Sequence, residues 1–156
     1  MKKRLAMLVL AGAMVTSSLT GCGLKDSATV ATVAGDEIPA GLANFYARMT
    51  QAQYESMYSS YLGDNMWTTE ASEGKTYEKL VKDEVLKDLE NMYLLEDHMD
   101  DYKISLSDDE KKAIKDAAKE FSKDNDKDDK EKVSGDTEYV ERYLTLVTIK
   151  QKMTDA

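Results

Sequence analysis

The 156-residue sequence carries 21 Lys and Arg against 30 Asp and Glu, a formal net charge of −9. Residues 1–21 contain three basic and no acidic residues, so the other 135 residues hold 18 basic and 30 acidic side chains, a net charge of −12. So acidic a chain lacks the basic stripe that neutralises phosphates, which argues against nucleic-acid binding, and anionic lipid head groups do not attract it. One Cys and one His exclude an internal disulfide and the four ligands of a structural zinc site.

The first two dozen residues follow the order of a secretory signal peptide. Residues 2–4 are basic and residues 5–15 are apolar, but the segment is shorter than the roughly 20 residues of a membrane-spanning helix. It ends in Leu19, Thr20, Gly21 and Cys22. This ending resembles the lipobox of bacterial lipoproteins, and the resemblance implies cleavage before Cys22 and a diacylglycerol on its thiol. The alternative is an ordinary signal peptide that contains a Cys. We expect residues 1–21 to be the signal peptide, 22–27 a tether and 28–156 one helical domain.

The start of that domain predicts a small hairpin and a long helix. β-Branched residues from Ala28 onwards, followed by Gly35, indicate a strand and a turn, with Ile38 in the returning strand. Pro39 suits a first helical position, and three-and-four spacing predicts a helix over residues 40–62 that Gly63 ends. Its predicted apolar stripe is Leu42, Phe45, Met49, Ala52 and Ser56.

The rest of the chain predicts a polar loop over residues 64–75, around Trp67, and then further helices. Thr76 can cap a second helix from residue 77 to about 102. Its predicted core stripe is Val81, Val85, Leu89, Met92 and Met99. Ser107 and Glu110 form a capping box for a third helix. The side chains expected to face inward from that helix are Ala113 or Ile114, Ala117 and Phe121.

The charged residues 122–134 predict a solvated loop or a frayed helix end. A last helix begins near Asp136 or Thr137 and reaches the end without a stop signal, which leaves a further segment after Ala156 open. Its apolar side is predicted to be Val140, Tyr143, Leu144 and Val147. The predicted fold class is therefore mainly α, with a short N-terminal hairpin followed by about four helices.

Catalytic and metal sites find little support in the residues. His98 is predicted to lie on the surface of the second helix, and no other His or free Cys could activate a nucleophile. Asp124, Asp126 and Asp128 alternate as in an EF-hand loop, but Asp129 and Gly135 stand where the loop needs Gly and a bidentate Glu. Neither a metal nor another cofactor is expected.

The first helix carries a second group of flexible and aromatic side chains. Two neighbouring elements could cover both faces of this helix, or the second face could bind peptide segments, because Met repacks readily and Tyr offers both a ring and a hydroxyl. The candidate client-binding residues are Tyr54, Met57, Tyr58, Tyr61 and Trp67.

Several motifs resemble, in order and spacing, the N-terminal segment of SurA/PrsA-like foldases. They are the strand and turn over residues 30–38, the helix with Asn44-Phe45-Tyr46, the stretch 74–80 before a Leu-rich helix, and the stretch 104–110. Ala34 departs from the pattern, since the family has Asn at this turn position. The resemblance covers roughly residues 28–150.

The resemblance implies a lipid-anchored chaperone that binds unfolded secreted polypeptides on the outer face of a Gram-positive-type membrane. In the family, prolyl isomerase activity belongs to a separate parvulin domain of about a hundred residues, which does not fit into this chain, so we expect no isomerase activity from it. A lipid-anchored adaptor that binds one folded partner is the main alternative. A substrate-binding or hydrolytic lipoprotein and a homodimer also remain open.

Overall fold

The computed structural model describes residues 25–63, 65–72 and 74–155. The predicted signal peptide and the lipobox, Leu19 to Cys22, lie outside the described residues. The elements in chain order are β1 (Thr29–Val33), β2 (Asp36–Pro39), α1 (Ala40–Leu62), η1 (Met66–Thr68), β3 (Glu70–Ser72), β4 (Lys75–Thr76), α2 (Tyr77–Asp97), η2 (Asp100–Tyr102), α3 (Asp108–Asp124), α4 (Lys127–Val133) and α5 (Thr137–Thr154). The fold is mainly α with a short N-terminal hairpin, as predicted, and its described part contains five α-helices rather than about four.

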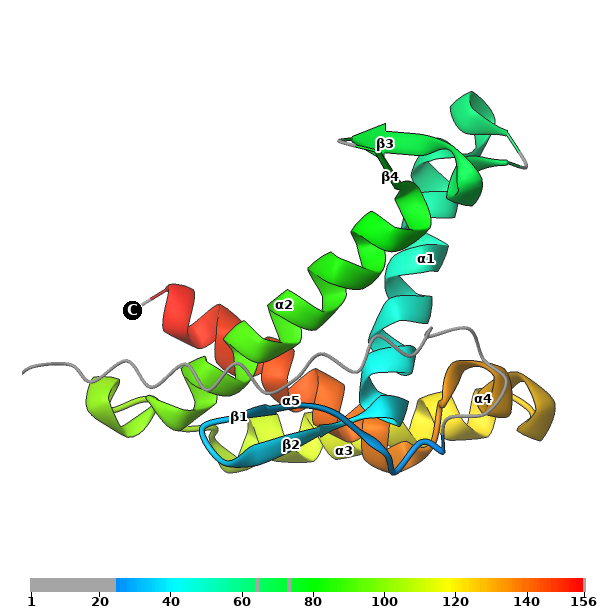
Figure 1. The fold of residues 1–156 in the computed structure, drawn as a ribbon. Helices are drawn as coiled ribbons and strands as arrows, with labels where there is room; N and C mark the ends of the chain where they lie inside the picture. The colour runs from blue at the N-terminus through cyan, green and yellow to red at the C-terminus, as the bar shows by residue number, and fades with distance from the viewer. Residues whose placement is uncertain (1–24, 64, 73, 156) are drawn as a thin grey trace, which may run out of the picture.

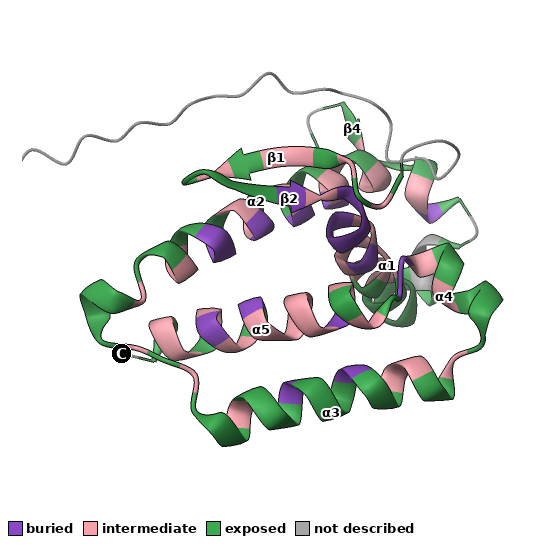
Figure 2. Ribbon diagram, turned by 90° about the horizontal axis from the view of Figure 1, so that it is seen from below, coloured by how far each residue is buried: buried purple, intermediate pink, exposed green. Residues whose placement is uncertain are grey.

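The elements form a base and an arm. The base contains α3, α4, α5, the β1–β2 hairpin, the start of α1 and the end of α2 (Figure 1); within it α5 lies between α2 and α3, and the hairpin lies against α1 and α2 (Figure 2). The second half of α1 and the first half of α2 rise from this base, and η1 and the β3–β4 hairpin lie at their far end (Figure 1). We call residues 48–84 the arm.

The predicted N-terminal hairpin is confirmed. β1 pairs antiparallel with β2, and only Ala34 and Gly35 separate them, with φ angles of 53° and 99°. A two-residue hairpin turn of this kind requires positive φ at both positions, which Gly tolerates and Ala adopts only at a cost. Pro39 pairs with Thr29 as the last residue of β2, so its predicted place as first helical residue is wrong and α1 begins at Ala40.

The predicted helix caps are largely confirmed. The Thr76 hydroxyl accepts a hydrogen bond from the Lys79 N–H (3.3 Å), and Gly63 after α1 has a φ of 66°. At the start of α3 the Glu110 N–H donates to the Ser107 hydroxyl (3.2 Å) and the Ser107 N–H donates to the Glu110 carboxylate (2.7 Å). α2 ends at Asp97 rather than near residue 102, because the chain tightens into η2 there.

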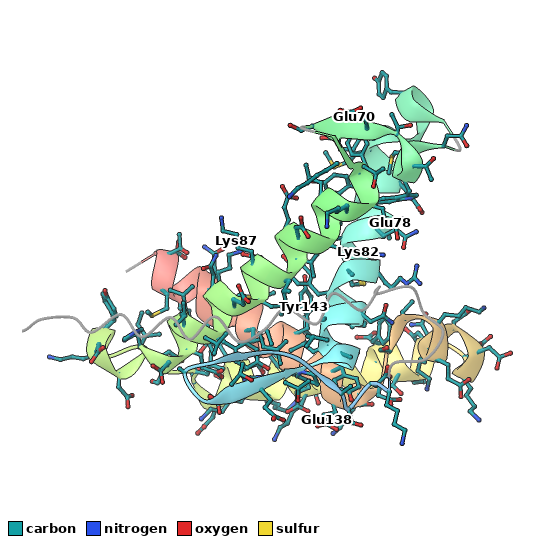
Figure 3. All side chains as sticks on the ribbon, viewed as in Figure 1. Glu70, Glu78, Lys82, Lys87, Glu138 and Tyr143 are labelled. Atoms are coloured by element: carbon teal, nitrogen blue, oxygen red, sulfur yellow. The ribbon has the colours of Figure 1, made fainter. Side chains whose placement is uncertain are left out.

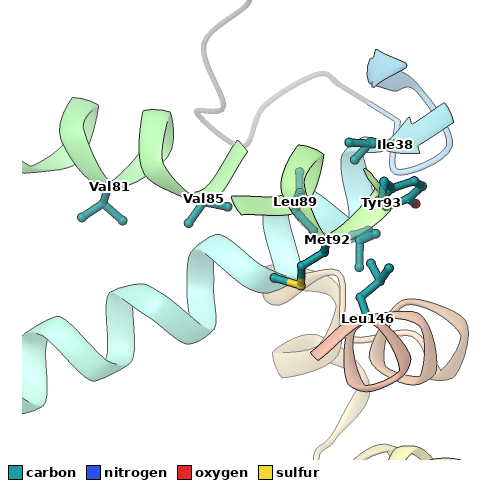
Figure 4. Packing of buried hydrophobic residues seen from close by; sticks show 9 residues of the cluster. Ile38, Val81, Val85, Leu89, Met92, Tyr93 and Leu146 are labelled. Atoms are coloured by element: carbon teal, nitrogen blue, oxygen red, sulfur yellow. The ribbon is translucent and has the colours of Figure 1, made fainter. Parts of the chain in front are cut away.

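The main core lies where α1, α2, α5 and the β1–β2 hairpin meet (Figure 4). Its buried side chains are Ile38, Leu42, Ala43, Val81, Val85, Leu89, Met92, Tyr93 and Leu146. A second cluster, formed by Phe45, Ala118 and Val140, fastens α3 to α1 and α5. Figure 2 shows that buried residues concentrate at the start of α1 and along α2 and α5, whereas α3 exposes most of its surface.

Parts of the predicted apolar stripes are wrong. Met49, Ala52 and Ser56 are exposed, because α1 has left the base by the time it reaches them. In α3 Ala117 is exposed, and the neighbouring Ala118 is buried in its place. Val147 is likewise exposed. The predicted Val140 is buried, and two residues that the sequence stripe did not include, Leu146 and Ile149, complete the buried face of α5. Met99 is only half-buried and lies beyond the end of α2.

Two segments predicted as loops contain regular structure. Residues 64–75 include η1 and β3, which pairs antiparallel with β4, and Met66 within η1 is buried. Residues 122–134 contain the end of α3 and the short helix α4, whose N-cap Asp126 accepts a hydrogen bond from the Asp129 N–H (2.9 Å). Among the described residues, no helix is both long and apolar enough to cross a membrane.

Charged side chains join α5 to the other helices. Both Arg142 guanidinium nitrogens donate to the Glu96 carboxylate at 2.6 Å, and the guanidinium carbon lies 4.6 Å from the centre of the Tyr93 ring. Burial lowers the pKa of Arg142, but hydrogen bonds to Glu96 and Tyr93 outweigh it and raise the pKa overall. Asp88 on α2 accepts from Lys150 and from the Tyr46 hydroxyl, both at 2.6 Å. The base therefore holds α1, α2 and α5 together by polar as well as apolar contacts.

The first described residues are bonded to the base. The Asp26 carboxylate accepts from the buried Ser134 hydroxyl (2.9 Å), which in turn accepts from the Asn44 side chain (2.9 Å). The Asp26 carbonyl accepts from the Gly41 N–H (2.8 Å). A Cβ at Gly41 would overlap the ring of Tyr139, so only glycine permits this close approach.

Candidate functional site

Three rings from two elements lie together in the arm. The Tyr54 ring centre on α1 is 5.6 Å from that of Tyr58 and 6.3 Å from that of Trp67 on η1. The Trp67 ring N–H donates to the Glu55 carboxylate (2.8 Å), which fixes the position of the indole against α1. The Tyr54 hydroxyl lies 3.4 Å from the Glu84 carboxylate on α2, so this Tyr also joins the two helices of the arm.

The five candidate residues fall into two groups by exposure. Tyr54 and Trp67 are half-buried and pack against the main core. Tyr61, Met57 and Tyr58 are exposed by 85%, 53% and 40% of their possible surface. Spacings of three and four residues place Tyr54, Met57, Tyr58 and Tyr61 on neighbouring positions of one side of α1. We call the five together the arm surface: Tyr54 and Trp67 support it, and the other three lie open.

The arm surface is exposed because the neighbours of α1 end before it does. α5 and the β1–β2 hairpin contact α1 near its start, within the base, whereas the far end of α1 lies beside α2 and η1 (Figure 1). α2 uses Val81 and Val85 for its contact with the core, and Met66 fills the space beneath η1. A helix long enough to leave the base therefore carries large apolar side chains into solvent.

Two carboxylates, those of Glu55 and Glu84, lie against this surface. Residues 49–74 contain four acidic residues and no Lys or Arg. Hydrogen bonds from Gln51 and Trp67 lower the pKa of Glu55, so its carboxylate is ionised at neutral pH. Partial burial and the nearby charge of Glu84 raise the pKa of Tyr54, which keeps its hydroxyl protonated as a donor. Glu70 lies at the far end of the arm (Figure 3).

The other sequence candidates lie apart from the arm surface. His98 is exposed at the C-terminal end of α2, where its Nδ1 lies 2.9 Å from an Asp101 carboxylate oxygen. Asp124 ends α3 and Asp126 caps α4. In the part of the chain that the structure describes, no group of three or more His, Cys, Asp or Glu side chains is arranged to hold a metal ion.

Sequence reasoning missed some of the residues that support the arm surface. Glu55 and Glu84 look like ordinary surface residues of charged helices, and only the structure places each beside an aromatic side chain. Met66 gave a weak signal, as a Met next to a Trp in a polar segment.

Comparison with known proteins agrees with the fold. The family model described as a SurA-like N-terminal domain matches residues 3–134. This range contains the β1–β2 hairpin and all of α1 to α4, and ends before α5. No curated protein and no solved structure matches the chain significantly. Because the family model covers most of the sequence, the chain belongs to the SurA-like N-terminal domain family.

Proposed function

We propose that this protein is a chaperone module that binds unfolded exported polypeptides outside the cytoplasm, and that a lipid on Cys22 attaches it to the outer face of a membrane. The observation that carries the chaperone function is the arm surface, where Met57, Tyr58 and Tyr61 lie exposed on a helix of a SurA-like domain. Single exposed apolar side chains are common on proteins, but a group of them on neighbouring positions is typical of an interaction site.

Binding would be passive and adaptable. Rings and a flexible thioether contact apolar segments of many shapes, since Met repacks at little cost and Tyr combines a ring with a hydroxyl. Trp67 and Tyr54 pack against the core, and Tyr54 contacts the ring of Tyr58, so a client does not have to order that ring. The net negative charge of the rest of the chain would keep client complexes apart and soluble.

The place of Asp26 suits a lipid anchor at Cys22. Asp26 is bonded to the base, and a chain of four residues reaches at most about 14 Å, so the base would stay close to the bilayer. α1 has 23 residues and is about 35 Å long at 1.5 Å per residue. Its far end can therefore lie well clear of the lipid head groups, where clients are accessible.

The test of the chaperone function compares two sets of exposed residues. We expect the purified protein to suppress aggregation of at least two unrelated unfolded clients, measured by light scattering. The combined substitution Met57→Ser, Tyr58→Ser and Tyr61→Ser should remove this suppression without changing the helical content measured by circular dichroism. Tyr102→Ser is the matched control, because Tyr102 is 65% exposed but lies in η2, at the other end of α2.

Two results would contradict the proposal. Suppression that survives the triple substitution would place client binding elsewhere, and saturable binding of a single folded partner would favour an adaptor. Isomerisation of a proline test peptide by the chain would contradict the expectation that it has no isomerase activity.

The lipid anchor has its own test. The membrane-extracted protein should carry the mass of a diacylglycerol on Cys22, and Cys22→Ser should release the protein from the membrane.

A further inference from the structure

We propose that the arm surface selects polypeptide segments in which Lys or Arg flanks aromatic or aliphatic residues. This specificity rests on the chaperone function proposed above and adds the chemical class of the client. It follows from how charge is distributed around the arm surface, which is separate from the net charge of the chain.

The first observation is a stretch of sequence without Lys or Arg, between Arg48 and Lys75, that carries the whole arm surface. The 26 residues from Met49 to Gly74 contain every side chain of that surface and four acidic residues, but neither Lys nor Arg. Elsewhere the acidic residues are interspersed with Lys; α3 alone contains Lys111, Lys115, Lys119 and Lys123 at four-residue intervals. An apolar segment bound at the arm surface therefore meets a one-sided negative field.

The second observation is that the carboxylates touching the aromatic cluster form no direct ion pair with a described Lys or Arg; hydrogen bonds from Gln51 and Trp67, with the more distant charge of Arg48, lower the pKa of Glu55. Glu55 accepts hydrogen bonds from Gln51 and Trp67, both at 2.8 Å, and Glu84 lies beside the Tyr54 hydroxyl. Among the described residues, neither carboxylate is within ion-pair distance of a Lys or Arg. In contrast, Glu78 and Asp83 on the same helix α2 are paired with lysines.

These carboxylates and the exposed rings beside them are groups that attract a cation on a client. A Lys or Arg beside an apolar residue could pair with Glu55 or Glu84 while its neighbour contacts Tyr58 or Met57. Arg and Lys are also attracted to the faces of Tyr and Trp rings, and Tyr61 leaves most of its ring exposed. Acidic segments would meet like charges on the same carboxylates, so the surface rejects them as well as attracting basic ones.

A second copy of the chain is the competing occupant, since α3 exposes Lys111, Lys115, Lys119 and Lys123. We favour client segments because α3 is not a basic helix: it contains six acidic residues against five Lys. Such a mixed helix carries little net attraction for the arm.

The single Trp of the chain makes the test direct, because Trp67 belongs to the arm surface. Its fluorescence in the full chain is titrated with three peptides that lack Trp and Tyr. All share a Leu-Phe-Val-Leu-Phe centre, and their flanks are Lys-Lys, Ser-Ser or Glu-Glu. We expect the Lys-flanked peptide to bind about tenfold more tightly than the Glu-flanked one at low salt. The preference should fall below about twofold near 1 M salt, where screening reduces the Debye length to about 3 Å.

A pair of charge-matched variants locates the effect. Glu55→Gln with Glu84→Gln should reduce the preference for Lys flanks to about threefold or less at low salt. Glu120→Gln with Asp124→Asn removes the same two charges from exposed positions of α3 and should leave the preference unchanged. Circular dichroism checks that both variants keep their helices, and the salt dependence of the unsubstituted chain tests the proposal independently of either.

The outcomes separate this inference from the chaperone function. Equal binding of the three peptides would overturn the charge preference and leave the chaperone function intact. If no peptide binds and no client is protected from aggregation, the chaperone function itself fails. A salt-sensitive dimer in sedimentation, from which the Lys-flanked peptide is excluded, would show that a second copy occupies the surface and would overturn the proposal.

Discussion

The ion pair between Arg142 and Glu96 should be among the most stabilising polar contacts of this domain. Its side chains are only 30% and 28% exposed, both nitrogen–oxygen distances are 2.6 Å, and the guanidinium also lies on the Tyr93 ring. Exposed pairs contribute about 0–1 kcal/mol and breaking fully buried ones costs about 3–5 kcal/mol, so this half-buried pair lies between them. We expect Arg142→Ala to lower the free energy of unfolding by about 2–3 kcal/mol, including about 1 kcal/mol from the ring contact.

A double-mutant cycle isolates the pair from the ring contact. Urea unfolding of Arg142→Ala, Glu96→Gln and the combined variant, followed by far-UV circular dichroism, should give a coupling energy of about 1–1.5 kcal/mol. Lys112 and Asp116 form the reference pair, because their side chains are 76% and 54% exposed. We expect no resolvable coupling between them. If both cycles gave equal coupling, half-burial would not be what makes the Arg142 pair strong, and the reasoning would be refuted.

Three further predictions concern the backbone and pH. Ala34→Asn should raise the free energy of unfolding by about 0.5–1 kcal/mol in urea titrations, because Asn tolerates the positive φ of this turn better than Ala; an unchanged midpoint would contradict a strained turn. Gly41→Ala should lower the free energy of unfolding by about 1–3 kcal/mol, because the added Cβ meets the Tyr139 ring. If only the higher helix propensity of Ala mattered, the substitution would instead raise the thermal midpoint of unfolding. Hydrogen bonds from Lys152 and from the N-cap backbone N–H lower the pKa of Glu110 from 4.5 to about 2. Its folded-state pKa is depressed, so the stabilisation is present above pH 4.5 and is lost as the pH falls towards 2, and Glu110→Gln should flatten the thermal midpoint across this range.

Much of the candidate site could be predicted from sequence. Tyr and Met at three- and four-residue spacing marked one side of α1, and the structure leaves Met57, Tyr58 and Tyr61 of that group exposed. The sequence could not separate these from Tyr54 and Trp67, because Tyr, Met and Trp all occur both in protein cores and on binding surfaces. It also gave no sign of Glu55 and Glu84, whose places beside Trp67 and Tyr54 depend on contacts between residues that are distant in the chain.

The sequence by itself determined the local structure of this protein. The helix caps at Thr76 and Ser107, the end of α1 at Gly63 and the turn at Gly35 follow from contacts within four residues, which sequence spacing specifies directly. Only the tertiary structure decided which face of each helix is buried. α1 is longer than the base that it crosses, so its predicted apolar stripe is buried in the core at Leu42 and exposed to solvent at Met49. In α5 the buried face passes to Leu146 and Ile149 because α2 and α3 approach it from different sides, and periodicity within one helix cannot encode the direction of its neighbours.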